Sequence, residues 1–393
     1  MLRVLTLSTL FPDASRPGFG AFVARQTLGL AAHPGVELKV AAPVGLPFGR
    51  PGGLLGSHRA RAGLPAREDW KGLDVVRPRF TTLPFRGGSF NPAGLYRSLA
   101  RTLDRLRAEF PFDVIDAEFF YPDGPAAIEL GRRYGIPVSI KARGSDIHVW
   151  GSRPHSLEQI VDAGRAAAGM LAVSEALRRD MIALGLPAGR IRVLHTGVDR
   201  TMFHPGDRAR LKAELGIEGP LVVTAGNLIP LKGQALLIEA MRELPGHLLI
   251  AGDGPEHGRL SADIARAGLE GRVRLLGRLP HADLPRLFAA ADVMALASAS
   301  EGLANVWVEA LACGTPIVIT DVGGAREVVT SASAGRIVER TVEAIAAGIL
   351  DILGSPPEQA DVVAQVEAFS CERNSDALYA HLDRLVRERR SIE

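Results

Sequence analysis

Residues 292–320 read DVMALASASEGLANVWVEALACGTPIVIT, and the order of apolar and polar segments in this stretch decides the fold class. An apolar run of strand length leads into a loop with a glycine, then into a helix-like segment, and then into a second apolar run. Short buried strands that alternate with helices are typical of α/β proteins with parallel sheets. The stretch therefore predicts one strand–helix–strand unit of such a sheet.

The same alternation runs through the whole chain. Strands are expected in the second half at 221–226, 247–252, 273–277, 292–298 and 316–320. In the first half they are expected at 4–9, 37–42, 74–76, 113–117, 138–140 and 169–173, with helices such as 22–32, 92–109 and 125–134 between them. Because the pattern restarts at Leu221 after a polar passage, it predicts two similar modules rather than one.

The length of 393 residues also favours two domains, since it exceeds what one hydrophobic core usually supports. We expect a first domain at 1–203 and a second at 204–370. The remaining residues, 371–393, follow the second module, and a helix at about 369–387 is expected to pack back on the first domain.

Composition excludes several classes of protein. With 47% apolar and 23% charged residues, the chain is not intrinsically disordered. Cys313 and Cys371 are too few for a disulfide framework or a cysteine-based zinc site, which predicts a reducing compartment. No segment approaches the roughly 20 apolar residues of a membrane-spanning helix, and the N-terminal run lacks a signal-peptide cleavage pattern. We expect a cytoplasmic protein whose membrane contact, if any, is peripheral and on the inner face.

Positive charge is concentrated in the first half of the chain. The net charge is only +2, but residues 46–107 contain 12 Lys and Arg against 4 Asp and Glu. Arg97, Arg101 and Arg105 follow one another at i, i+4 spacing on a predicted helix, which places them on one face. This surplus suits anionic lipid head groups or a phosphate-bearing acceptor. A solvated basic face is the alternative, and no nucleic-acid partner is expected.

The loops after the predicted strands come first in a search for function, because ligands of open parallel sheets bind outside the carboxyl ends of the strands. The loop after 221–226 places Lys232 and Gly233 at a helix start, where an ammonium and backbone N–H groups suit a diphosphate. Plain helix capping is the alternative. After 247–252, Asp253 and Gly254 form a tight turn whose backbone is available to line a nucleoside pocket.

Glu301 and Glu309 follow the strand at 292–298. They are eight residues apart, which would leave them roughly 80° apart around one continuous helix. We therefore expect Glu301 in the loop, a helix that begins near Ala304 or Asn305, and Glu309 just beyond its first turn. The N–H groups of the helix start suit a phosphate, and each carboxylate can accept from two vicinal hydroxyls. The alternative is a solvated helix face, which the apolar surroundings of Glu309 disfavour.

Two further loops contain glycines before a helix. Gly18 and Gly20 follow the first strand, and Gly323 and Gly324 follow the strand at 316–320. Such glycines serve backbone geometry and also permit close approach of a ligand. There is no full GxGxxG after the first strand and no GxxxxGK[ST], which disfavours dinucleotide oxidoreductases and P-loop NTPases.

Together these residues resemble the retaining glycosyltransferases of family 4, which have the GT-B fold. The resemblance is carried by Glu301 and Glu309 at their spacing, the following ACGTPIVITDVGGAREVV, and the upstream GNLIPLKG and GDGPE, and it covers nearly the whole chain. It implies an α/β fold of two Rossmann-like domains that face each other across a deep cleft. The first domain would bind the acceptor and the second a nucleotide diphosphosugar.

The resemblance also implies roles for single residues. Glu301 would contact hydroxyls of the hexose, Glu309 the ribose and Lys232 the diphosphate. The catalytic set would be Glu301, Lys232, Asp146 and Arg143. Backbone and side-chain contacts to the donor would come from Gly18, Gly20, Gly226, Asn227, Asp253, Gly254, Gly302, Leu303, Ala304 and Asn305.

Two positions depart from the family pattern. Asn227 stands where the family often has an arginine, so the charge on the diphosphate would depend more on Lys232. The segment from Arg143 to Asp146, RGSD, stands where the family shows His-Gly-x-Asp. Arg143 supplies no neutral imidazole, but its guanidinium can pair with a phosphate or an acidic sugar. A structural ion pair is the alternative for Arg143.

No metal-binding cluster or paired-acid DxD element is apparent, so we expect no metal and no cofactor. Charge on the leaving group would be stabilised by Lys232, by N–H groups around Leu303 and Ala304, and by Arg143. The predicted reaction is the transfer of a hexosyl group, with retention, from a nucleotide diphosphosugar to a hydroxyl of a glycan, glycolipid or small-molecule acceptor. The expected setting is bacterial polysaccharide or glycolipid assembly. The alternatives are a sugar-nucleotide epimerase or phosphorylase of the same fold, and a non-catalytic sugar-nucleotide-binding protein.

Overall fold

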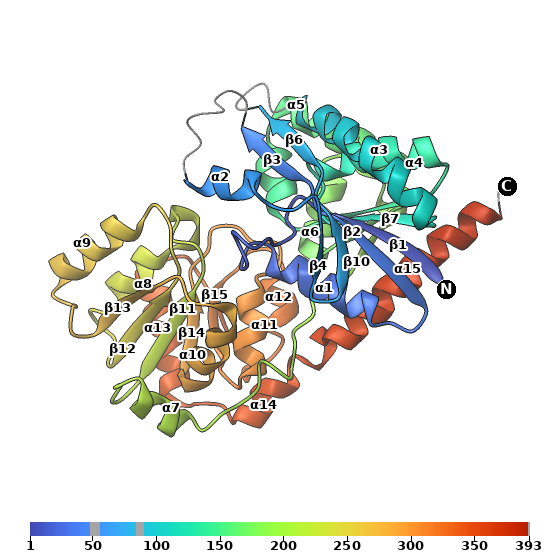
Figure 1. Cartoon of the computed structure of the whole chain (residues 1–393). Coiled ribbons are helices and arrows are strands. Elements are labelled where there is room, and N and C mark those ends of the chain that lie inside the picture. Colours follow the sequence, from blue (N-terminus) through green and yellow to red (C-terminus); the bar gives the residue numbers. More distant parts are fainter. Residues whose placement is uncertain (48–55, 84–89, 392–393) are drawn as a thin grey trace. The chain divides into compact units, whose positions relative to one another are not determined.

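The computed structural model describes residues 1–47, 56–83 and 90–391, and these form two compact units. Unit 1 comprises Met1–Thr196 together with Glu372–Glu393, and unit 2 comprises Gly197–Cys371 (Figure 1). Of the basic residues counted above, Arg50 and Arg86 lie outside the described residues.

Unit 1 is built on an eight-stranded sheet with the strand order β10-β9-β8-β7-β1-β2-β5-β4. The strands are β1 (Leu2–Leu7), β2 (Val36–Ala41), β4 (Arg67–Trp70), β5 (Leu73–Val76), β7 (Val114–Ala117), β8 (Val138–Ala142), β9 (Gly169–Ala172) and β10 (Ile191–Val193). A separate pair consists of β3 (Val44–Pro47) and β6 (Arg79–Thr82). All six strands predicted in this half are present within a few residues.

Strand β4 departs from the predicted parallel pattern, because it pairs antiparallel with β5. The turn between them contains Lys71 at φ 54° and Gly72 at φ 85°, which is the backbone of a tight hairpin. The sequence of β4, REDW, lacks the apolar run that marks a buried strand, so periodicity did not reveal it. Strand β10 was not predicted either, because it has only three residues.

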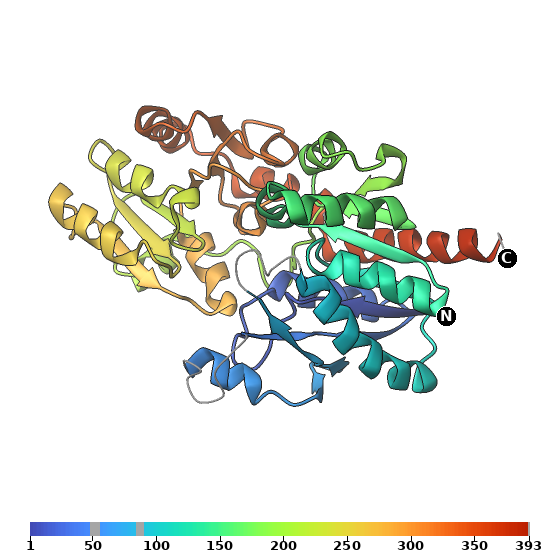
Figure 2. The same cartoon turned by 90° about the horizontal axis from the view of Figure 1, so that it is seen from above.

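The helices of unit 1 are α1 (Ala21–Ala31), α2 (Gly56–Ala62), α3 (Asn91–Glu109), α4 (Asp123–Tyr134), α5 (Pro154–Ala166), α6 (Glu175–Ala183) and the C-terminal α15 (Cys371–Arg390). Helix α15 lies beside β1 in both views (Figures 1 and 2). Its side chains Leu378, Leu382 and Val386 are buried in one apolar cluster with Leu2 and Val4 of β1. The last helix of the chain thus completes the core of the first unit.

Unit 2 contains a six-stranded parallel sheet with the order β13-β12-β11-β14-β15-β16. The strands are β11 (Leu221–Ala225), β12 (His247–Ala251), β13 (Val273–Gly277), β14 (Val293–Leu296), β15 (Ile317–Thr320) and β16 (Gly335–Val338). The five strands predicted in this half are confirmed, and β16 was not predicted. This order is that of a Rossmann fold.

The helices of unit 2 are α7 (Arg208–Glu214), α8 (Gln234–Ala240), α9 (His257–Ala267), α10 (Leu284–Ala290), α11 (Asn305–Ala312), α12 (Ala325–Val328), α13 (Val342–Gly354) and α14 (Gln359–Ala364). Helices α8, α9 and α13 share one buried apolar cluster with β11, β12 and β14. Helices α10 and α11 pack against β11 and β15. The helices therefore bury the strands, and the loops at the strand ends are the parts of the sheet that a ligand can reach.

Candidate functional site

The sheet of unit 2 has its topological switch point between β11 and β14. From β11 the chain moves outward through β12 and β13, and it then returns to place β14 on the other side of β11. Loops that leave the two central strands at their carboxyl ends diverge at such a point, and this opening is where Rossmann-type sheets bind ligands. The loop after β11 carries Lys232, and the loop after β14 carries Glu301.

Lys232 and Glu301 are in direct contact. The ammonium of Lys232 donates a hydrogen bond to Oε1 of Glu301, and the hydroxyl of Ser298 donates to the same oxygen at 2.6 Å. The side chains of Lys232 and Glu301 are largely buried, with 19% and 11% of their surface exposed. A cation and a carboxylate are thus held side by side at the switch point, and Glu301 is oriented by two donors.

The backbone of the β11 loop requires glycine. Lys232 ends a 3₁₀ turn, and Gly233 caps α8 in the left-handed region at φ 70°. A Cβ atom on Gly233 would lie 2.2 Å from the carbonyl oxygen of Ala297, the residue that follows β14. Close packing of this loop against the end of β14 therefore places Lys232 beside the Glu301 loop.

Arg340 also ties these two loops together, and sequence analysis missed it. Its Nε donates to the carbonyl of Ala297 at 2.9 Å, and its Nη2 donates to the carbonyl of Pro230 at 3.2 Å. Pro230 begins the 3₁₀ turn that contains Lys232. No sequence signal marked Arg340, because it lies more than a hundred residues from Pro230.

The loop after β12 packs on the loop after β11. The N–H of Leu228 in the first of these loops donates to the carbonyl of Asp253 in the other at 3.0 Å. The β11 loop is also tied to the helix that follows it, because the side chain of Gln234 donates to the carbonyl of Asn227 at 3.1 Å. A Cβ atom on Gly254 would lie 2.4 Å from the carbonyl oxygen of Leu228. The structure thus brings the predicted donor residues of these loops together, including Gly226, whose N–H donates to the carbonyl of Ala251 at 3.0 Å.

The loop that contains Glu301 and Gly302 packs against the glycine pair after β15. The N–H of Gly324 donates to the carbonyl of Gly302 at 2.8 Å, and a Cβ atom on Gly323 would lie 2.3 Å from the carbonyl oxygen of Glu301. These two glycines therefore support the backbone on which Glu301 sits.

Helix α11 begins at Asn305, as predicted, and Leu303 and Ala304 just before it are buried. Ala304 provides no side-chain cap. The N–H of Trp307 donates to the carbonyl of Ala304 at 3.1 Å, and the N–H groups at a helix start in general have no i−4 carbonyl to bind. Glu301 lies in the preceding loop, which also agrees with the prediction.

Glu309 lies in α11 beyond the first turn and is 2% exposed, which excludes a solvated helix face. Its Oε1 lies 3.0 Å from Nε2 of His281. The ring of His281 in turn packs edge-on against Phe203, with centroids 5.2 Å apart. His281 was not predicted, because a histidine among ten scattered ones carries no signal until the fold places it against an acid.

In unit 1, Gly18 and Gly20 lie before α1. Gly20 caps this helix at φ 65°, and a Cβ atom there would lie 1.5 Å from the carbonyl oxygen of Leu10. A Cβ atom on Gly18 would meet open space. Gly20 is therefore required by the turn itself, whereas the turn imposes no such packing demand on Gly18.

Arg143, at the carboxyl end of β8, belongs to a buried network of charges. Its Nη2 contacts Glu118 and donates to Oε1 of Gln26 at 2.7 Å. Lys141 donates to Glu118 at 2.5 Å and to the same oxygen of Gln26 at 2.8 Å. Burial alone would raise the pKa of Glu118, but the positive charges of Arg143 and Lys141 lower it to about 2. The structure thus places Arg143 in the ion pair that was the alternative reading of this residue.

Asp116 and Asp146 are buried near the same strand ends. Burial raises the pKa of Asp116 to about 7, although Lys141 opposes this. Asp146 is fully buried and accepts hydrogen bonds from the backbone N–H groups of Phe120 at 2.9 Å and Gly144 at 2.8 Å. Burial also raises the pKa of Asp146. Asp146 thereby orders the loops after β7 and β8.

The predicted site residues thus gather in two groups, one in each unit. Within the described ranges 1–47, 56–83 and 90–391, no group of three or more His, Cys, Asp or Glu side chains is arranged to hold a metal ion. In the same part of the chain, no helix combines the length and apolarity needed to cross a membrane.

Comparison with known proteins identifies the family. The family described as Glycosyl transferases group 1 matches residues 207–368, and Glycosyltransferase Family 4 matches residues 54–201. The chain is a family 4 glycosyltransferase. The two matched regions of this glycosyltransferase meet almost end to end, and each lies within one of the two modules apart from a few residues at their boundary.

Curated relatives of this glycosyltransferase include the putative teichuronic acid biosynthesis glycosyltransferase TuaC of Bacillus subtilis, which is 27% identical over 96% of this chain and 97% of the relative. The D-inositol 3-phosphate glycosyltransferase of Mycobacterium marinum is 35% identical over 50% of this chain and 46% of the relative. The second similarity covers only about half of either protein.

Solved structures confirm the predicted GT-B fold of this family 4 glycosyltransferase. HepE of Anabaena, crystallised with UDP, has a TM-score of 0.74 at 22% identity and covers 98% of this chain and 100% of HepE. Sucrose-phosphate synthase of Thermosynechococcus elongatus has a TM-score of 0.77 at 19% identity and covers 100% and 99% of the two chains. At these identities the likeness establishes the fold and not the substrate.

Proposed function

We propose that this glycosyltransferase transfers a hexosyl group, with retention, from a nucleotide diphosphosugar to a hydroxyl of a glycan, glycolipid or small-molecule acceptor. The observation that carries the proposal is the contact of Lys232 and Ser298 with Glu301 at the switch point of unit 2. In a nucleotide diphosphosugar the diphosphate and the hexose are joined directly, so a cation and a carboxylate in contact match two adjacent parts of one ligand.

Each residue has a distinct task in this proposal. Lys232 binds the diphosphate, Glu301 accepts hydrogen bonds from hexose hydroxyls, and Glu309 accepts them from the ribose. The bond between the anomeric carbon and the phosphate oxygen breaks while the bond to the acceptor oxygen forms on the same face. The acceptor proton passes to the departing diphosphate, whose charge Lys232 and the N–H groups near Leu303 and Ala304 stabilise.

The relatives support a nucleotide-sugar donor. HepE has been crystallised with UDP and with UDP-glucose, and TuaC is named for teichuronic acid biosynthesis. We propose a cytoplasmic enzyme of polysaccharide or glycolipid assembly, with an acceptor domain in unit 1 and a donor domain in unit 2. Arg97, Arg101 and Arg105 are exposed on α3, where they suit an anionic acceptor or membrane surface.

The proposal is tested by a panel of nucleotide sugars in a thermal-shift assay, followed by a transfer assay with the donor that stabilises the protein most. Lys232→Ala and Glu301→Ala should each lower transfer at least about 100-fold, since each removes a charged contact to the transition state. Lys212→Ala is the matched control, because Lys212 pairs with Asp292 at the start of β14, at the opposite edge of the sheet. Normal turnover in either site variant would contradict the assignment.

Two other outcomes separate the alternatives. An epimerase of this fold would convert the donor with no acceptor present, so product formation in an acceptor-free assay would replace the transferase proposal. We also propose that transfer needs no metal ion. Full activity after treatment with EDTA supports this, and loss of activity that Mg²⁺ or Mn²⁺ restores would contradict it.

A further inference from the structure

Unit 1 contains a cavity of about 680 Å³ at the end of its sheet where β8, β9 and β10 begin. It is formed by the C-terminal ends of α4 and α5, the start of β8, the turn before β10 and the last turns of α15. The predicted acceptor-side residues, Arg143 among them, follow the opposite ends of the strands. The cavity is therefore a separate place in the fold, and its volume is in the range of small-molecule sites.

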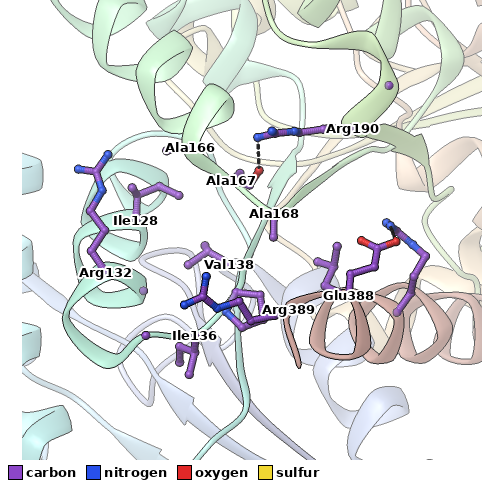
Figure 3. A pocket seen from close by; sticks show the side chains of 16 residues that line it. Ile128, Arg132, Ile136, Val138, Ala166, Ala167, Ala168, Arg190, Glu388 and Arg389 are labelled. Carbon is purple, nitrogen blue, oxygen red and sulfur yellow. Dashed lines mark hydrogen bonds and ion pairs between the residues drawn. The ribbon is translucent and has the colours of Figure 1, made fainter. Parts of the chain in front are cut away.

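The floor of this cavity is apolar and its wall is basic. Ile128, Val138 and Leu385 contribute buried side chains to the floor. The charged side chains of the lining are Arg132, Arg190, Arg384, Arg389 and Glu388. Figure 3 shows the guanidinium groups of Arg132, Arg190 and Arg389 around the side chains of Ile128 and Val138. Arg132 also pairs with Glu129, which is not part of the lining, so four guanidinium groups stand against two carboxylates and the cavity keeps a net positive charge.

Two of these arginines are held in place by the fold. Nη1 of Arg190 donates to the carbonyl oxygen of Arg165 at 2.7 Å and to that of Ala167 at 3.0 Å, at the end of α5. Figure 3 shows the bond to Ala167. These bonds take up carbonyl groups that would otherwise repel an anion. Nη1 of Arg384 donates to Glu388 at 2.6 Å, while its Nε is buried without a hydrogen-bond partner. A buried donor without an acceptor is costly, but this atom has less than 1 Å² of accessible surface and so lies behind the lining, which leaves the Nη groups of Arg384 as its part of the cavity wall.

We propose that this cavity binds a phosphate ester that carries a small apolar or aromatic group. The phosphate is recognised by the guanidinium groups, whose planar forks match phosphate oxygens in bidentate pairs. The apolar part lies on the floor formed by Ile128, Val138 and Leu385. The site is independent of the proposed donor site, because all of its lining residues belong to unit 1 and Lys232, Glu301 and Glu309 belong to unit 2.

The test uses the full-length protein and phenyl phosphate as the probe in isothermal titration calorimetry. Phenyl phosphate should bind more tightly than phenol or inorganic phosphate alone, because both parts of the cavity are then used. The double variant Arg132→Gln/Arg389→Gln removes two exposed side chains and leaves the Arg190 contacts intact, so the protein should fold. Its affinity for phenyl phosphate should fall at least about tenfold, as expected for the loss of charge-assisted contacts. Arg179→Gln, an exposed arginine on α6, is the matched control and should bind as the wild type does.

Further arms identify the source of the phosphate and keep the two sites apart. Vesicles of phosphatidylglycerol in phosphatidylcholine test a lipid head group, and sedimentation that the double variant weakens would assign the phosphate to a lipid. Binding of phenyl phosphate without such sedimentation would assign it to a soluble ester. Displacement of phenyl phosphate by UDP, equal binding by wild type and double variant, or no binding of either probe would overturn the proposal. Lys232→Ala should lose donor binding and bind phenyl phosphate as the wild type does, and this result would support a cavity that is independent of the donor site.

Discussion

The contact between His281 and Glu309 leads to a quantitative prediction about donor binding. Glu309 is 2% exposed, so water cannot easily replace a lost donor, and Nε2 of His281 lies 3.0 Å from its Oε1. A hydrogen bond to a charged group contributes about 1.5–3 kcal/mol. If this bond orients Glu309 for the ribose, its loss should weaken nucleoside diphosphate binding roughly 10- to 150-fold.

The variant that isolates this bond is His281→Phe. Phenylalanine keeps an aromatic ring against Phe203, whose centroid lies 5.2 Å from that of His281, and it removes only the donor. His281→Gln keeps an N–H donor, and it should recover most of the affinity. His247→Phe is the control, because His247 is half-buried at the opposite end of the same sheet, where β12 begins.

The assay is isothermal titration calorimetry with UDP, GDP and ADP, followed through the one that binds the wild type most tightly. The Michaelis constant for the donor should rise in His281→Phe, with a much smaller change in kcat, since the ribose is remote from the reacting bond. Binding by His281→Phe within about twofold of the wild type would refute a positioning role for His281. Equal losses in His281→Phe and His281→Gln would also refute it, because the donor would then not matter.

Three further predictions concern stability. Gly233→Ala should lower the free energy of unfolding by about 1–3 kcal/mol and impair donor binding, because the new Cβ atom strains a φ of 70° and meets the Ala297 carbonyl. Gly216→Ala is the control, since Gly216 has a φ of 67° but open space around it, and it should cost only about 1 kcal/mol. Equal losses in urea denaturation would contradict the steric argument. Arg143→Gln should lower the free energy of unfolding by about 3 kcal/mol, because it leaves Glu118 with one buried cation fewer. Adding Glu118→Gln to the same chain should restore much of this loss. Unchanged stability of Arg143→Gln would show that the ion pair is not structural. Burial raises the pKa of Asp123 to about 7, so its contribution to stability is present below about pH 4 and is lost as the pH rises through 7. Asp123→Asn should flatten the resulting fall in stability by up to about 4 kcal/mol between pH 4 and 8, and parallel pH profiles of the two proteins would contradict this.

Much of the fold could be predicted because burial in a parallel sheet leaves a local signature. The strands of the second half are continuous apolar runs, and β11 and β14 are buried throughout. The start of α11 at Asn305 was also predictable, since Gly302 and the apolar periodicity end the loop there. Strands β4 and β10 were not predictable in this way, because one has no apolar run and the other has three residues.

The sequence by itself determined the residue types at the strand ends: Lys232 after one strand, Glu301 after another, and Glu309 inside the helix that follows. These positions depend on local periodicity and on glycine turns, which act over a few residues. The sequence alone did not determine that Ser298 and Lys232 both donate to Glu301. It also did not determine that His281 lies against Glu309 or that Arg143 is paired with Glu118.

Those contacts were decided by the tertiary structure, because each joins side chains from different loops or elements. Lys232 and Glu301 are 69 residues apart in the chain and meet only because β11 and β14 are neighbours in the sheet. Alternation of strands and helices specifies that a parallel sheet forms, but the order of its strands depends on which helices and strands pack together. Only that order brings a cation, a carboxylate and their supporting residues to one end of the sheet.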